Sequence, residues 1–143
     1  MIVIDASATV ELLLQTETGM VVAKRLQAPD ETLHAPHLLD VEVAQVIRRF
    51  VLSGTLAAKR ASAALLDLAD LDLSRYSHDV LLPRMWQLHK NLSAYDATYV
   101  ALAEALGAAL LTADAKLART PGHAARMELV RVSSKRGLGL SRA

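Results

Sequence analysis

Short apolar runs alternate along the chain with longer segments in which apolar residues recur at helical spacing. Runs of three to five apolar residues are typical of buried strands, whereas apolar residues three and four positions apart indicate helices. On this basis we predict strands at residues 2–4, 33–35, 71–73, 109–112 and 129–132. The same pattern predicts helices at residues 7–14, 20–27, 36–53, 55–69, 80–90 and 93–106, and a short one that begins at residue 114.

Polar residues and glycines at the ends of these segments support the predicted boundaries. Ser7, Thr55 and Ser93 can each cap the start of a helix through a side-chain oxygen. Gly54 and Gly107 are placed to end a helix. Strands that alternate with helices, often two helices to a connection, predict an α/β fold whose mostly parallel sheet is covered on both faces.

Composition narrows the class of protein. A chain of 143 residues suits one domain, and 52% hydrophobic against 3% aromatic residues predicts an aliphatic core. A mean hydropathy of +0.26 is high for a soluble monomer and indicates an apolar surface used in association. No apolar run approaches the length that spans a bilayer, so we expect no membrane partner. The absence of cysteine excludes disulfides and thiolate metal sites and fits a reducing compartment, the cytoplasm.

Charge is distributed unevenly although the net charge is only +1. Residues 115–143 carry seven basic residues and one acidic residue, which leaves residues 1–114 with a net charge of −5. A basic carboxyl-terminal region beside an acidic site can guide a polyanion, but a solubilising tail explains the same charges equally well. We expect a domain at residues 1–132 followed by a flexible basic tail at 133–143.

Four acidic residues stand where the pattern calls for core or capping groups: Asp5, Glu42, Asp96 and Asp114. Asp5 follows the first predicted strand and Asp114 follows the strand at 109–112. The carboxyl ends of parallel strands meet at the sheet edge where ligands bind. Close carboxylates repel by about 4 kcal/mol per pair at an effective dielectric near 20, so a fold that gathers them needs a cation, a shared proton or a basic partner.

Each of these acids also has a structural explanation. Asp5 and Asp114 fit helix caps. Glu42, like Asp40 on the other side of the same apolar stripe, could be an ordinary solvated helix border. Asp96 could complete a variant capping box, although it shares an otherwise apolar helix face on which an unpaired carboxylate is costly. The four together are harder to explain by capping alone.

Other chemistries find less support in the sequence. His34 and His37 lack a third soft ligand nearby, which argues against zinc. Phosphate-binding glycine loops and the nucleophile elbow of hydrolases are absent. Trp86 lies among apolar residues and is better explained as a core or dimer contact than as a base-stacking platform.

Four segments resemble the acidic motifs of PIN domains. They are Val3-Ile4-Asp5-Ala6-Ser7, Glu42-Val43-Ala44, Tyr95-Asp96-Ala97-Thr98-Tyr99-Val100-Ala101-Leu102-Ala103-Glu104 and Leu111-Thr112-Ala113-Asp114-Ala115-Lys116-Leu117. Their order, and a match over residues 1–132, resemble the VapC toxins of VapBC toxin–antitoxin pairs. The resemblance implies a PIN-like three-layer α/β/α sandwich.

The resemblance also implies the roles of individual residues. It implies that Asp5, Glu42, Asp96 and Asp114 are metal ligands and catalytic residues. The hydroxyl of Thr112, and less directly that of Ser7, would support them. Two positions depart from the family pattern. Gln45 stands where many relatives have asparagine, and Leu117 stands where some have a further acid. A second metal position is therefore less strongly implied than the first.

The activity implied by the resemblance is that of a Mg²⁺-dependent endoribonuclease toxin, with Mn²⁺ as an alternative ion. A metal-activated water would cleave the RNA backbone, with Arg49, Lys116 and Arg119 as candidate phosphate contacts. The implied protein partners are a VapB-type antitoxin and a second copy of the toxin. The competing hypotheses are a PIN-like module that binds metal or RNA without cutting it, a small-molecule phosphohydrolase, and a protein in which all four acids are only caps.

Overall fold

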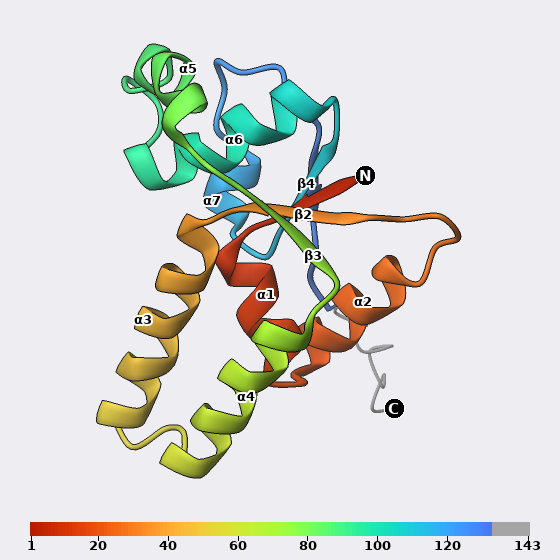
Figure 1. The fold of residues 1–143 in the computed structure, drawn as a ribbon, viewed down its shortest axis with the longest axis vertical. Helices are drawn as coiled ribbons and strands as arrows, with labels where there is room; N and C mark the ends of the chain where they lie inside the picture. The colour runs from red at the N-terminus through yellow and green to blue at the C-terminus, as the bar shows by residue number, and fades with distance from the viewer. Residues whose placement is uncertain (133–143) are drawn as a thin grey trace, which may run out of the picture.

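A five-stranded sheet forms the centre of the molecule (Figure 1). The structure is a computed structural model and describes residues 1–132, so the predicted tail at 133–143 lies outside the described residues. The strands are β1 (Ile2–Ile4), β2 (Leu33–Pro36), β3 (Leu73–Tyr76), β4 (Ala109–Thr112) and β5 (Met127–Leu129). Their order is β3-β2-β1-β4-β5 and all four pairings are parallel, which confirms the prediction of a mostly parallel sheet.

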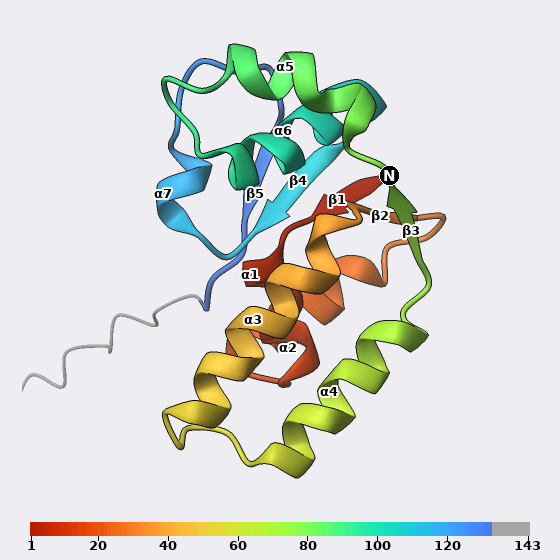
Figure 2. The ribbon, with the colours of Figure 1, turned by 60° about the vertical axis from the view of Figure 1, so that its left-hand side comes forward.

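Helices form a layer on each face of the sheet. The connections β1–β2 and β2–β3 contain α1 (Ala6–Leu13), α2 (Glu17–Leu26), α3 (Leu38–Leu52) and α4 (Ala58–Asp70). The β3–β4 connection contains the short 3-10 helix η1 (Asp79–Leu81), α5 (Leu82–Gln87) and α6 (Ala94–Leu106), and α7 (Ala115–Ala118) follows β4. Crossovers between parallel strands are right-handed, so connections that run along the sheet in opposite directions place their helices on opposite faces. The connections β1–β2 and β2–β3 run one way along the sheet, and β3–β4 runs back. Figure 2 shows α5 and α6 across the sheet from α1–α4, as the predicted three-layer fold requires.

The core is aliphatic, as the composition predicts. The three residues of β1 are fully buried, and the four residues of β4 are buried too. Strands covered on both faces read as continuous apolar runs, which explains why these two were the clearest in the sequence. Helix α6 is buried at every position from Ala97 to Ala103, and its small side chains allow it to lie close to the sheet. Each large aliphatic side chain buried in this way contributes about 1.5–3 kcal/mol.

The carboxyl ends of β1 and β4 flank the point where the strand order changes direction. From β1 the chain proceeds to β2 and β3 on one side, whereas from β4 it proceeds to β5 on the other. A crevice forms at such a switch point, and ligands of open α/β sheets bind there. Ile4 pairs with Leu111, so Asp5 and Thr112 leave the sheet side by side.

Two of the predicted helix caps are wrong. Asp5, rather than Ser7, caps α1, because its carboxylate accepts the Ala8 N–H at 2.9 Å. Helix α4 begins at Ala58 without a side-chain cap, and Thr55 lies outside it. The predicted ends of α6 are confirmed, with Ser93 as the N-cap and Gly107 as the C-cap.

Several predicted boundaries shift because pairing and capping, rather than the apolar pattern alone, set them. Pro36 closes β2 opposite Tyr76 instead of opening a helix, and β3 starts at Leu73 instead of residue 71. Strand β5 lies at 127–129 rather than 129–132, and α5 ends three residues before the predicted end at residue 90. Helix α2 begins at Glu17 because the Thr16 side chain caps it.

In residues 1–132, no helix combines the length and apolar character that crossing a membrane requires.

Candidate metal centre

Asp5 lies at the centre of the acidic site, at the carboxyl end of β1, and is 5% exposed. Its Oδ1 accepts the Ala8 N–H at 2.9 Å and the Ser7 hydroxyl at 2.7 Å, and Oδ2 accepts the Thr112 hydroxyl. Burial raises the pKa of Asp5, the three hydrogen bonds lower it, and the charge of Asp96 raises it further. The surrounding hydrogen bonds therefore hold the carboxylate in one orientation, while burial makes its charge costly.

The hydroxyls of Ser7 and Thr112 connect the ends of β1 and β4. They lie 3.2 Å apart, and each accepts a backbone N–H from the turn after β4. Ser7 Oγ receives the N–H of Ala113 at 2.9 Å, and Thr112 Oγ1 receives that of Asp114 at 3.0 Å. Both hydroxyls thus donate to the carboxylate of Asp5.

Glu42 reaches the same region from α3. It is half-buried, and its Oε1 accepts the hydroxyl of Tyr99 on α6 at 2.6 Å. Burial raises the pKa of Glu42, the Tyr99 bond lowers it, and the charges of Asp96 and Asp5 raise it. Glu42 is therefore electrostatically coupled to two other predicted site residues.

Asp40 points elsewhere, which separates the two acids that the sequence pattern left equivalent. Both of its oxygens accept hydrogen bonds from Arg75, at 2.8 and 3.0 Å. This ion pair accounts for Asp40 as a link between α3 and β3, away from the other acids.

Asp96 is half-buried in the first turn of α6. Ser93 caps the helix by accepting the backbone N–H of Asp96 at 3.1 Å, so the cap does not account for the carboxylate itself. Burial raises the pKa of Asp96 and the charge of Asp114 adds to the rise, whereas Ser93 and Lys116 lower it. Asp96 thus interacts with every other predicted acid of the site.

Asp114 is the most exposed of the four. Its Oδ1 accepts the N–H groups of Lys116 at 2.9 Å and Leu117 at 3.2 Å, which confirms that it caps α7. Its second oxygen accepts no hydrogen bond from residues 1–132. Capping therefore explains one oxygen of Asp114 and leaves the other available.

The four carboxylates share one region but do not form a closed cage. Within residues 1–132, no three acidic or histidine side chains are arranged so that they could hold a metal ion as they stand. The donor set is nevertheless oxygen-only and mutually repelling, which suits a hard divalent cation. Mg²⁺ usually binds one or two carboxylates and completes its shell with water and phosphate oxygens. The residues fit such an ion in chemistry and in electrostatic coupling.

A cavity of about 280 Å³ opens beside Glu42. It is lined by Ala6, Leu38, Val41, Glu42, Gln45, Val46, Arg49 and Tyr95. Arg49, one of the predicted phosphate contacts, and Gln45, which replaces the family asparagine, therefore lie in the same wall as Glu42. Leu117, which stands where some family members have a further acid, is 2% exposed and belongs to the core.

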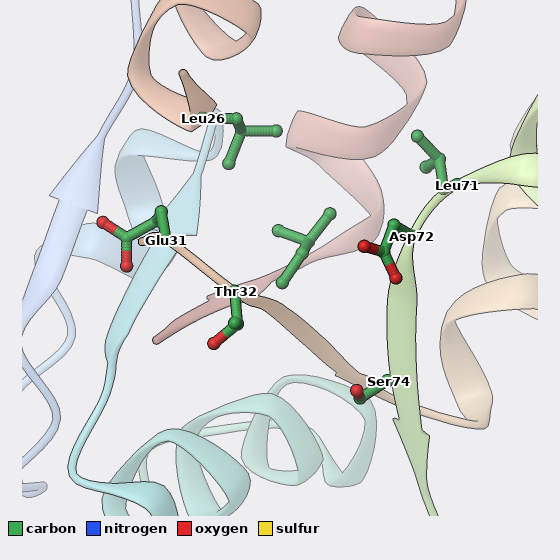
Figure 3. Close-up of a pocket in the computed structure, with 7 residues that line it drawn as sticks. Leu26, Glu31, Thr32, Leu71, Asp72 and Ser74 are labelled. Atoms are coloured by element: carbon green, nitrogen blue, oxygen red, sulfur yellow. The ribbon is translucent and has the colours of Figure 1, made fainter. Parts of the chain in front are cut away.

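A second cavity, of about 310 Å³, opens at the other edge of the sheet (Figure 3). It lies at the amino ends of β2 and β3, between Thr32, Asp72 and Ser74. Glu31, the other acid in its wall, is paired with Arg25 and with the amino group of Met1 at 2.9 Å each. This cavity has no part in the acidic site.

Tyr99 was not singled out as a functional residue from the sequence. It stands three positions after Asp96, so helical spacing puts it on the apolar face that Asp96 shares, where it reads as an ordinary core residue. A buried tyrosine needs a partner for its hydroxyl, and that requirement was the available signal. The identity of the partner, Glu42, depends on how α3 and α6 approach each other in space.

Comparisons with known proteins show the family to which the chain belongs. The family model described as PIN domain matches residues 2–123. Ribonuclease VapC12 of Mycobacterium tuberculosis is 42% identical over 130 residues, which cover 91% of this chain and 99% of that protein. Ribonuclease VapC9 of the same organism is 46% identical over 120 residues, covering 84% and 91%.

A solved structure shares the fold at low identity. The chain is 16% identical to a chain in the crystal structure of VapBC2 from Rickettsia felis bound to a promoter DNA fragment, with a TM-score of 0.64 and coverage of 92% of this chain and 100% of that one. The family match over most of the chain and the identity to nearly full-length relatives show that this protein belongs to the VapC family of PIN-domain proteins.

Proposed function

We propose that this protein is the toxin of a type II toxin–antitoxin pair and that it cleaves RNA with a bound divalent cation, Mg²⁺ or Mn²⁺. The observation that carries the proposal is the group formed by Asp5, Glu42 and Asp96. Burial and the charge of a neighbouring predicted acid raise the pKa of each of these carboxyls at the switch point of a parallel sheet. The relatives named ribonucleases support RNA as the substrate.

The side chains of the site divide the work of binding and orientation. A bound divalent ion would polarise a phosphate and lower the pKa of an attacking water. Asp5 is fixed by its three hydrogen bonds and Glu42 by Tyr99, so both would present defined oxygens to a bound ion. Arg49, in the wall of the Glu42 cavity, supplies positive charge for the RNA backbone.

RNA cleavage with and without chelator tests the proposal. We expect the wild-type protein to cut a labelled RNA in Mg²⁺, to stop in EDTA and to resume when excess Mg²⁺ is restored. Asp96→Asn removes one central charge and should slow cleavage about a hundredfold or more. The matched control is Asp67→Asn, an exposed position on α4, which should cleave at the wild-type rate.

Three results would contradict the proposal in different ways. Cleavage that persists in EDTA would show that the reaction does not depend on a divalent cation. Full activity of Asp96→Asn would show that the acidic site is not where RNA is cleaved. RNA binding without cleavage under all conditions would favour a non-cleaving module.

We propose a VapB-type antitoxin as the protein partner. Membership of the VapC family supports it, and the Rickettsia felis relative is described as a VapBC complex. The protein encoded beside this one is expected to co-purify with it and to suppress its RNA cleavage. Cleavage that continues at saturating amounts of that protein would exclude it as the antitoxin.

We also propose that a second copy of the chain covers an apolar face near the site. Among the large apolar side chains that are more than half exposed, five lie near the start of α3, on η1 and α5, and at the start of α6: Val41, Val80, Leu82, Trp86 and Tyr95. The cavity beside Glu42 contains Val41 and Tyr95, and a cavity of about 370 Å³ contains Leu82 and Trp86 with Ser93 and Ala94. The start of α6 therefore joins the two groups into one surface, of the kind that marks association.

Trp86 is the only tryptophan of the chain, so its fluorescence reports on this surface. Dilution from micromolar concentration should shift its emission to longer wavelength as the dimer separates. Trp86→Glu should give a monomer by light scattering, whereas Leu66→Glu, at an exposed position on α4, should not. A wild-type monomer at micromolar concentration would exclude the dimer.

A further inference from the structure

Tyr99 connects the two helical layers at the acidic edge of the sheet. It lies on α6, one turn after Asp96, and is 1% exposed. Its hydroxyl donates to Glu42 Oε1 at 2.6 Å, and Glu42 lies on α3, 57 residues away in the chain. Figure 2 shows α3 and α6 in different layers, so this bond links the two layers.

The donor and acceptor of this hydrogen bond follow from the two groups. A phenol carries an O–H to donate and an ionised carboxylate only accepts, so Tyr99 is the donor and Glu42 Oε1 the acceptor. A buried phenol needs an acceptor, and in residues 1–132 the Tyr99 hydroxyl has Glu42 alone.

The bond leaves half of the Glu42 carboxylate available. Oε1 is engaged by Tyr99, whereas Oε2 accepts no hydrogen bond from residues 1–132. Glu42 also lines the cavity of about 280 Å³ beside the site. A glutamate side chain has three rotatable bonds, and a fixed partner for one oxygen restricts where the other can lie.

We infer that Tyr99 is a positioning residue that orients Glu42 toward the divalent cation. The inference rests on the proposed metal-dependent function and adds a residue to it. Tyr99 holds one oxygen of the carboxylate so that the other is presented to the ion without a search through side-chain conformations. Partners that orient a metal ligand in this way typically change metal affinity 10–100-fold when removed.

Mn²⁺ binding, measured from the free-ion signal in electron paramagnetic resonance, tests this role without any RNA. Tyr99→Phe removes only the hydroxyl and keeps the buried ring, and we expect it to bind Mn²⁺ about tenfold more weakly than the wild type. The matched control is Tyr76→Phe, which also removes a hydroxyl with an internal bond, to His34 Nδ1 at 2.7 Å. Tyr76 lies on β3, outside the acidic group, so this variant should keep wild-type affinity.

A cycle with Glu42→Gln separates positioning from general support of the fold. If Tyr99 acts through the Glu42 carboxylate, adding Tyr99→Phe to Glu42→Gln leaves Mn²⁺ affinity unchanged. Thermal unfolding without metal shows that each variant is folded before its affinity is compared.

The outcomes are distinct. If the wild type and Tyr99→Phe bind Mn²⁺ with equal affinity, this inference is overturned and the proposed function stays intact. A tenfold loss that persists in the Glu42→Gln background would show that Tyr99 does not act through Glu42. Absence of Mn²⁺ binding in the wild type would overturn the metal-dependent function and the role of Tyr99 with it.

Discussion

At the scale of single residues, two of the site acids have a second structural task. Asp5 caps α1 and Asp114 caps α7, each through backbone N–H groups. The sequence pattern offered capping and metal binding as alternatives, whereas the geometry allows both at once. A carboxylate has about four acceptor positions, and a cap uses one or two of them.

Substitutions at Asp114 separate these two tasks. Asp114→Asn retains an acceptor for the N–H groups of Lys116 and Leu117 but removes the charge, so we expect its free energy of unfolding to match the wild type. Asp114→Ala removes the cap as well and should cost about 1 kcal/mol. Both should cleave RNA more slowly. Urea unfolding measures the difference, and equal destabilisation of the two variants would contradict the capping role.

The pH dependence of stability follows from the raised pKa values of the Asp5, Glu42 and Asp96 carboxyls. A carboxyl whose folded-state pKa lies above its unfolded value favours the folded state while it is protonated. That contribution is present below the ordinary values of 3.8 and 4.5 and is lost as pH rises through the folded-state pKa. We therefore expect the metal-free protein to lose stability from these groups as pH rises from about 4 toward neutrality.

Asp96→Asn removes one of the three carboxyls and also the charge that raises the pKa of the other two. Its free energy of unfolding in EDTA, measured by urea titration across this pH range, should fall less than that of the wild type. Identical pH dependence in the two proteins would show that the carboxyls are not coupled.

At the scale of elements, the sequence predicted best where one segment carries its own signals. Helix α6 has a serine cap, an apolar body and a terminal glycine, and its predicted ends match the structure. Strands β1 and β4 are continuous apolar runs and were also placed correctly. Strand β3 has partly exposed residues and is defined by its pairing with β2, which no local pattern contains.

The same limit applies to the site. The apolar runs placed Asp5 and Asp114 at strand exits because that information is local. Which of Asp40 and Glu42 lies with the other acids depends on how α3 packs against β3 and α6. Arg75 on β3 pairs with Asp40, whereas Tyr99 on α6 donates to Glu42. The resemblance implied Glu42 as the site residue, whereas the two contacts could be predicted neither from it nor from periodicity.

Gly19 tests the packing of α1 against α2. A Cβ at this position would lie 1.9 Å from the backbone oxygen of Glu11, so Gly19→Ala should force α2 away from α1 and cost about 2–3 kcal/mol. Gly54 is the matched control, because its φ of +78° disfavours alanine but nothing lies within 4 Å. Gly54→Ala should cost about 1 kcal/mol. Urea unfolding should rank the two in this order, and a reversed order would contradict the close helix contact.

At the scale of the whole molecule, the fold brings separate acidic segments to the carboxyl edge of the sheet, although their carboxylates repel one another. Asp5 follows β1, Glu42 lies on α3 and Asp96 lies on α6, so no single element makes the site. Because the protein without metal carries this repulsion, a bound cation should stabilise the entire fold.

Added Mg²⁺ should therefore raise the melting temperature. At 100 times the dissociation constant a ligand adds about 2.7 kcal/mol, which corresponds to a rise of several degrees for a chain of this size. Asp96→Asn should lose most of the rise, and Asp67→Asn should keep it. An equal rise in all three proteins would place the stabilising ion somewhere else.

Anomalous scattering from Mn²⁺ soaked into crystals of the protein tests whether these carboxylates bind one cation. We expect a peak at the carboxyl edge of β1 and β4, within coordinating distance of oxygens from Asp5 and at least one of Glu42, Asp96 and Asp114. A peak remote from these carboxylates, or none at saturating Mn²⁺, would contradict a shared metal site.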